Sequence, residues 1–152
     1  MNALPDHPPP PSAPPFKTIA ELVREHAAFR PKQAAIIHGE RRISWEQVDA
    51  MMDRVAASLQ RDGVKPRQSI AIAGANSPEY LALFLGALRA GLAVAPLPTG
   101  ATTAQLATMV ADSGARHFFV DATVPPFETG ARRIFMDASS SPSLEAWLLP
   151  HG

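Results

Sequence analysis

The sequence has no cysteine and no long apolar run. Without cysteine the chain can form no disulfide, thiolate metal site or thiol nucleophile, which fits a reducing compartment. No apolar run approaches the roughly 18 residues that cross a bilayer. The amino-terminal stretch lacks both the basic and the apolar region of a secretory signal. We therefore expect a cytoplasmic protein without a membrane span.

The chain also has no net charge. The 14 lysines and arginines balance the 14 aspartates and glutamates, so the formal net charge at pH 7 is +0. The two arginine pairs, Arg41-Arg42 and Arg132-Arg133, are too isolated to make a basic patch. We expect neither a nucleic acid nor an anionic membrane surface as a partner.

Proline, by contrast, is abundant at the amino terminus. Residues 1–16 carry seven prolines, a density that removes backbone donors and favours the extended polyproline II conformation. We expect a disordered leader outside the fold, with a ligand for a proline-reading domain as the alternative. Residues 17–152 then form one domain, for which the hydrophobic fraction of 46% can supply a core.

Helix-start signals mark the first half of this domain. Two capping boxes, Thr18 with Glu21 and Ser44 with Gln47, predict helices that begin at Thr18 and Ser44. The first helix has one apolar face, made by Ile19, Leu22 and Val23. Between the two helices, residues 34–44 predict a hairpin that turns at Gly39. Gly63 lies where the second helix should end.

The second half alternates strands and helices. Short apolar runs predict strands over residues 68–74, 92–97, 116–120 and 132–136. Helices are predicted over 77–90, beginning at Ser77-Pro78, and over 102–113, with Thr102 and Gln105 as a capping box. Gly91 and Gly114 end these helices, and residues 143–149 predict a last helical turn or two. The alternation predicts an α/β fold with an open, mainly parallel sheet and crossover helices.

Two details of packing follow from the apolar pattern. The strand over 92–97 is apolar on both faces, so we expect it to be internal to the sheet. The buried side of the helix over 77–90 is expected to consist of its large apolar residues, Tyr80, Leu81, Phe84, Leu85 and Leu88.

Candidate catalytic chemistry is sparse. The chain has no Gly-rich phosphate loop of common spacing, and Lys17, Lys32 and Lys65 lie outside any such loop. The turn at residues 74–78 joins a strand to a helix amino terminus, where anions bind readily. It offers only one glycine and a cap, which favours a structural turn over a phosphate site.

The remaining polar and aromatic residues favour structural roles. No two histidines stand at metal-ligand spacing; they are His7, His26, His38, His117 and His151. Glu79 suits the first turn of a helix, where the dipole favours an acid. Met51-Met52, Trp45 and Trp147 are interpreted as packing residues. We assign no catalytic, cofactor-binding or metal-binding residue to this chain.

Four stretches in order resemble the adenylate-forming acyl-CoA synthetases, a family similar to peptide-synthetase adenylation domains and luciferases. The stretches are "ISWEQVD" (43–49), "QSIAIAGANSPEYLALFLGALRAG" (68–91), "LRAGLAVAPLP" (88–98) and "TTAQLATMVADSGARHFFVD" (102–121). The first and third resemble the family's first two core motifs. The resemblance identifies residues 17–152 as a partial amino-terminal α/β subdomain of such an enzyme.

The sequence also departs from the family pattern. Ala75 stands where the family often has proline, and Pro98-Thr99-Gly100 replaces an Asn-Pro-basic stretch. No segment resembles the family's phosphate loop, its adenine-binding aromatic residue, its magnesium-binding glutamate, its ribose-binding aspartate or its catalytic lysine. We expect those parts to lie beyond the end of this chain.

The resemblance implies a function for a parent enzyme rather than for this chain alone. The parent would be an ATP-dependent acid–CoA ligase that uses ATP, magnesium and CoA, with a fatty acid slightly favoured as substrate. This chain would be an inactive scaffold whose partner is the remainder of the enzyme, and its exposed apolar face could cause self-association. The alternative is a self-contained α/β binding or interaction domain, because an open sheet can bind a ligand unaided.

Overall fold

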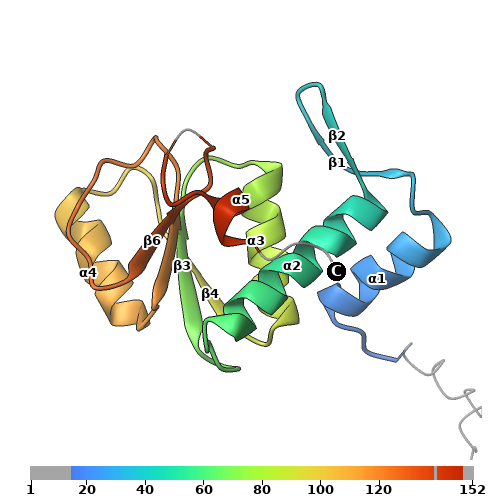
Figure 1. The fold of residues 1–152 in the computed structure, drawn as a ribbon, viewed down its shortest axis with the longest axis horizontal. Coiled ribbons are helices and arrows are strands. Elements are labelled where there is room, and N and C mark those ends of the chain that lie inside the picture. Colours follow the sequence, from blue (N-terminus) through green and yellow to red (C-terminus); the bar gives the residue numbers. More distant parts are fainter. Residues whose placement is uncertain (1–14, 139, 149–152) are drawn as a thin grey trace, which may run out of the picture.

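Four parallel strands form the centre of the molecule (Figure 1). The computed structural model describes residues 15–138 and 140–148. The strands lie in the order β4, β3, β5 and β6, with bounds β3 (Ser69–Ala73), β4 (Ala93–Pro96), β5 (His117–Val120) and β6 (Arg132–Phe135). Pairing is parallel throughout, with Ile70 opposite Val94 and Ala71 opposite Phe118. The predicted α/β fold with an open parallel sheet is therefore confirmed.

Helices cover both faces of this sheet. The helices are α1 (Ile19–Phe29), α2 (Trp45–Arg61), α3 (Pro78–Arg89), α4 (Thr103–Ser113) and α5 (Leu144–Trp147). One face packs Ile70 and Ile72 of β3 and Phe119 of β5 against α2, α3 and α5. The other face packs Phe118 and Val120 against α4. Figure 1 shows α4 alone on its side of the sheet.

A smaller unit lies beside the sheet. The antiparallel hairpin of β1 (Ala34–His38) and β2 (Arg41–Ser44) turns at Gly39, as predicted. It projects from the start of α2 and points away from α1 (Figure 1). Val23 of α1 and Val48 and Met52 of α2 form a separate buried cluster beneath it.

The helix boundaries follow the predicted signals. All three capping boxes form, and Ser77 Oγ accepts the Tyr80 N–H at 3.1 Å, as an N-cap does. Gly91 and Gly114 follow α3 and α4 with φ of +80° and +68°. These angles lie in the left-handed region that favours glycine. The helix-to-strand returns are thus built on glycines, as the sequence predicts.

The predicted position of the strand over 92–97 is wrong. β4 lies at the edge of the sheet and is exposed to half-buried along its length, whereas β3 and β5 are the internal strands. Apolar residues on both faces are typical of an internal parallel strand. In the described part of the chain, nothing pairs with the outer edge of β4.

The predicted buried side of α3 is also wrong in large part. The residues of α3 that are buried are Pro78, Ala82, Leu83, Gly86 and Ala87. The small residues let α2 and α3 approach closely, because Gly86 has no side chain to hold α2 away. Leu81 is left exposed, while Tyr80, Phe84, Leu85 and Leu88 are half-buried. Of the large apolar residues of α3, Leu83 is therefore the one that is fully buried.

The apolar face of α1 is likewise mostly open. Only Val23 is buried, whereas Ile19 and Leu22 are exposed. The predicted leader falls outside the described residues except for Pro15 and Phe16, and residues 149–152 lie outside them too. Within the described ranges, no helix is both long and apolar enough to cross a membrane.

Candidate functional site

The carboxyl ends of β3 and β5 meet at the point where the sheet order reverses. The chain passes from β3 outward to β4 and then back across β3 to β5, which makes this the topological switch point of the sheet. Residues 74–77 follow β3, and the buried Asp121 follows β5. In open α/β sheets, ligands bind in the crevice outside this edge.

Here the edge is closed by a contact within the chain. The Ala75 N–H donates to Asp121 Oδ2 at 2.7 Å, and the Thr123 N–H donates to Asp121 Oδ1 at 3.0 Å. A Cβ on Gly74 would lie 2.7 Å from Asp121 Oδ2, so only glycine leaves room for the carboxylate. The Ala75 amide is thus used by a protein carboxylate. This arrangement supports the structural interpretation of the turn over a phosphate site.

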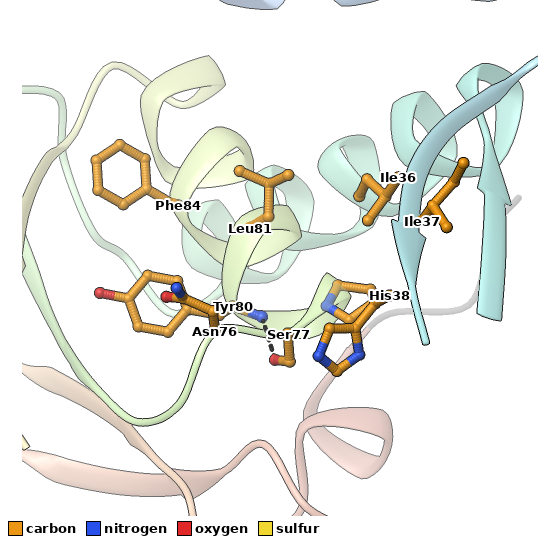
Figure 2. Close-up of a pocket in the computed structure, with 9 residues that line it drawn as sticks. Ile36, Ile37, His38, Asn76, Ser77, Tyr80, Leu81 and Phe84 are labelled. Atoms are coloured by element: carbon orange, nitrogen blue, oxygen red, sulfur yellow. Dashed lines mark hydrogen bonds between the residues drawn. The ribbon is translucent and has the colours of Figure 1, made fainter. Parts of the chain in front are cut away.

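An apolar pocket lies next to this turn, between the hairpin and α3. It has a volume of about 390 Å³ and is lined by Ile36, Ile37, His38, Asn76, Ser77, Pro78, Tyr80, Leu81 and Phe84. Figure 2 shows the side chains of β1 on one side and those of α3 on the other, with the polar residues Asn76, Ser77, Tyr80 and His38 below Leu81, Phe84 and Ile36. The pocket is suited to an apolar group that carries one hydrogen-bonding end.

An ion pair joins the two walls of the pocket. Arg41, at the start of β2, donates from Nη2 to Glu79 Oε1 at 2.6 Å and from Nη1 to Glu79 Oε2 at 3.2 Å. Burial alone would raise the pKa of Glu79, but its hydrogen bonds with Arg41 hold this pKa below its usual range. Glu79 is therefore a paired, ionised carboxylate of the first helical turn, as expected from its position.

Tyr80 is the one phenol in the sequence and lines the same pocket. Burial raises its pKa, so the hydroxyl stays protonated at neutral pH. The pocket thus offers a neutral hydroxyl, an amide, a second hydroxyl and an imidazole. It contains no nucleophile hydrogen-bonded to a base, which the covalent enzyme classes require.

A second polar cluster lies at the opposite end of the sheet. Asp62, which caps α2, accepts from His117 Nε2 at 2.8 Å and from Trp147 Nε1 at 2.7 Å. Arg61 and Arg132 also donate to this carboxylate. Burial alone would raise the pKa of Asp62, yet the bonds from Arg61, Trp147 and His117 lower it far below its usual range.

This cluster is structural, and no sequence pattern predicts it. It ties α2 to β5, β6 and α5, and it lies at the amino ends of the strands, away from the switch point. Trp147, interpreted from the sequence as a packing residue, is indeed buried. In the sequence, Asp62 lies between Arg61 and the helix-ending Gly63. This local pattern does not indicate that four hydrogen-bond donors meet at its carboxylate.

The other candidate residues do not converge. The ring of His26 packs at a tilt against Trp45 with ring centroids 4.5 Å apart, while His38 lies at the pocket. Lys17 pairs with Glu25 and Lys32 pairs with Glu46, and none of these residues follows β3 or β5 at the switch point. Among the residues that the structure covers, no group of three histidines or acids could hold a metal ion. His7 and His151 lie outside the described residues.

A family model described as "AMP-binding enzyme" matches residues 23–146. Curated relatives include tyrocidine synthase 3 of Brevibacillus parabrevis, 30% identical over 110 residues. Others are the indoleacetate–CoA ligase of Aromatoleum aromaticum, 35% identical over 79 residues, and the fatty acid–[acyl-carrier-protein] ligase ScoC of Streptomyces coeruleorubidus, 25% identical over 113 residues. These alignments cover 72%, 52% and 74% of this chain but only 2%, 16% and 22% of the relatives.

A solved structure agrees with the fold. The amino-terminal subdomain of NpsA from Klebsiella oxytoca superposes with a TM-score of 0.68 at 19% identity, over 78% of this chain and 31% of that one. The chain therefore spans under a third of the length of that subdomain and a quarter or less of the curated relatives above.

Proposed function

Because this chain belongs to the family of AMP-binding enzymes, we propose that it provides the first scaffold segment of an ATP-dependent acid–CoA ligase. In the proposed reaction a carboxylate attacks the α-phosphate of ATP, giving an acyl adenylate and pyrophosphate. The CoA thiol then takes the acyl group and AMP leaves. The observation that carries this proposal is the family match, which extends from α1 to α5.

The described residues do not fit ATP or magnesium by themselves. The switch-point amide of Ala75 is bonded to Asp121, and Lys17 and Lys32 are paired with acids elsewhere. We propose that the ATP, magnesium and CoA contacts come from polypeptide outside the described residues. Without them the chain should not activate an acid, because positioning and charge stabilisation carry most of such catalysis.

The acid is proposed to be a fatty acid. The fatty acid ligase among the relatives supports this choice, and the indoleacetate–CoA ligase makes aromatic acids the comparison class. The resemblance to peptide-synthetase adenylation domains adds amino acids as a third class to be tested.

ATP–pyrophosphate exchange tests the proposal. It should be run on the 152-residue chain and on the longest reading frame that contains it, with fatty, aromatic and amino acids. We expect exchange only with the longer protein and most strongly with fatty acids. Exchange by the 152-residue chain, with its intact mass verified, would overturn the scaffold proposal.

A self-contained binding domain is the second candidate, and the apolar pocket between the hairpin and α3 favours it. A natural stop codon directly after Gly152 and a monomeric, stable chain would support this alternative. A reading frame that continues into a Ser/Thr/Gly-rich loop and a lysine would instead support the ligase.

The partner surface of the scaffold is proposed to be the apolar side of the molecule. It is proposed to include the edge of β4 that pairs with no other described strand and the exposed apolar residues Leu81 of α3 and Ile37 of β1. We propose that the remainder of the enzyme covers this surface, and that the isolated chain associates with itself through it.

A further inference from the structure

The β1–β2 hairpin is anchored at its base. The Trp45 N–H donates to the Gln33 carbonyl at 3.1 Å, and the Glu46 N–H donates to the Pro31 carbonyl at 3.2 Å, which clips both ends of the hairpin to α2. Ile36 and Ile43 pack on the cluster formed with Val48 and Met52. These contacts position the base of the hairpin but not its turn.

The rest of the hairpin has little support. β1 and β2 pair only with each other among the described strands, and an isolated two-stranded hairpin is marginally stable in water. Ile37 is 63% exposed, and His38, Gly39 and Glu40 are exposed as well. The turn therefore depends on contacts with neighbouring elements outside the hairpin.

That support is the contact between Arg41 and Glu79. Within the described residues it is the one ion pair between the hairpin and α3. It is bidentate, and the side chains of Arg41 and Glu79 are 50% and 27% exposed. Glu79 is held in the first turn of a capped helix, so the rigid partner of the pair is α3.

The pocket lies between the same two elements. Ile36, Ile37 and His38 provide its hairpin wall, and Tyr80, Leu81 and Phe84 provide its α3 wall (Figure 2). We propose that the hairpin is an arm that pivots at its base on α2 and that the Arg41–Glu79 pair latches against α3. Release of the latch would move the hairpin wall away from α3 and widen the apolar pocket. This device concerns the 152-residue chain by itself and goes beyond the proposed ligase function.

Hydrogen exchange of the 152-residue chain, run at a concentration at which light scattering shows a monomer and followed by mass spectrometry, tests the latch. R41Q and E79Q should each raise the exchange rates of amides 36–43 about two- to fivefold, the factor that corresponds to an exposed ion pair of up to about 1 kcal/mol. Amides in α4 and β5 should be unchanged. R42Q is the matched control, because Arg42 is an exposed neighbour on the same strand that forms no ion pair with another described residue.

Two further measurements test whether the Arg41–Glu79 ion pair, rather than either side chain alone, protects the hairpin. The reversed pair R41E/E79R should restore slow exchange at amides 36–43. Raising the salt to about 0.5 M, which screens exposed charges over a few ångströms, should speed exchange in the wild-type chain but not in E79Q. Unchanged hairpin exchange in both single variants would overturn the latch. An equal rise in α4, or failure of the reversed pair to restore protection, would overturn it as well.

Discussion

Gly86 of α3 lies directly against Val55 of α2. A Cβ on Gly86 would lie 2.6 Å from the Val55 Cβ and 3.2 Å from the Met52 carbonyl oxygen. The first distance is shorter than real Cβ contacts show and the second is tighter than most of them, and the backbone of α2 cannot swing away as a side chain can. The close approach of α2 and α3 therefore requires a residue without a side chain at position 86.

Gly86→Ala should lower the free energy of unfolding by up to about 2 kcal/mol in net terms, because overpacking a tight core costs about 1–3 kcal/mol. The gain in helix propensity of about 1 kcal/mol offsets only part of that cost. Urea unfolding followed by circular dichroism measures the change. Gly100→Ala is the control, because nothing lies within 4 Å of its Cβ position. A Gly86→Ala chain as stable as wild type would show that the helices can separate at no cost.

The same contact explains which parts of the fold could be predicted from the sequence. Caps, glycine stops and strand–helix alternation are local signals, and they predicted the elements and the parallel sheet. Which side of α3 faces α2 depends on a fit between residues that are far apart in the sequence. Amphipathic spacing favoured Leu81 and Phe84, whereas Ala82 and Gly86 are buried and Gly86 faces Val55 of α2. The edge position of β4 was missed because apolar composition alone does not distinguish an internal strand from an edge strand.

Gly91 provides a second test of stability. Its φ of +80° is strained for any residue with a Cβ, and most strongly for a β-branched one. Gly91→Val should therefore cost about 1–2 kcal/mol of stability. Thermal unfolding of Gly91→Val and of Gly130→Val makes the comparison, since Gly130 has open space around it and no positive φ. Equal melting temperatures for the two variants would contradict a left-handed requirement at residue 91.

The ionisation of Asp62 should make the free energy of unfolding depend on pH. Against the effect of burial, hydrogen bonds from Arg61, Trp147 and His117 lower its pKa in the folded chain. A lowered carboxyl pKa stabilises the fold fully above the unfolded value of about 4, and this stabilisation is lost as pH falls through the lower folded value. Asp62→Asn should cost about 2–4 kcal/mol at pH 7 and progressively less below pH 4.

Urea unfolding at several pH values measures this effect. Asp112→Asn is the matched control, because Asp112 is an exposed acid on α4 and should change stability little at any pH. If Asp62→Asn lowers the free energy of unfolding equally at pH 7 and well below pH 4, the charge of Asp62 does not contribute to stability. His117 and Trp147 belong to the same cluster, so their variants should not add to that of Asp62.

The candidate site was less predictable than the fold. The interpretation of residues 74–78 as a structural turn rested on one glycine and a cap, and the contact with Asp121 supports it. The pocket could not be predicted, because Ile37 and Tyr80 come from separate segments and no sequence pattern indicates that they lie together. Burial of Asp62 among four donors likewise arises only from tertiary packing.

The proposed self-association can be tested at α3. Leu81 is 38% exposed beside the pocket, and Met109 of α4 is 36% exposed on the other side of the sheet. If the isolated chain associates through the apolar side of α3 and β1, Leu81→Lys should place a charge in the contact and shift the light-scattering mass toward the monomer. Met109→Lys adds the same charge at matched exposure and should leave the mass unchanged. A wild-type chain that stays monomeric at high concentration, or equal effects of the two substitutions, would contradict association through this surface.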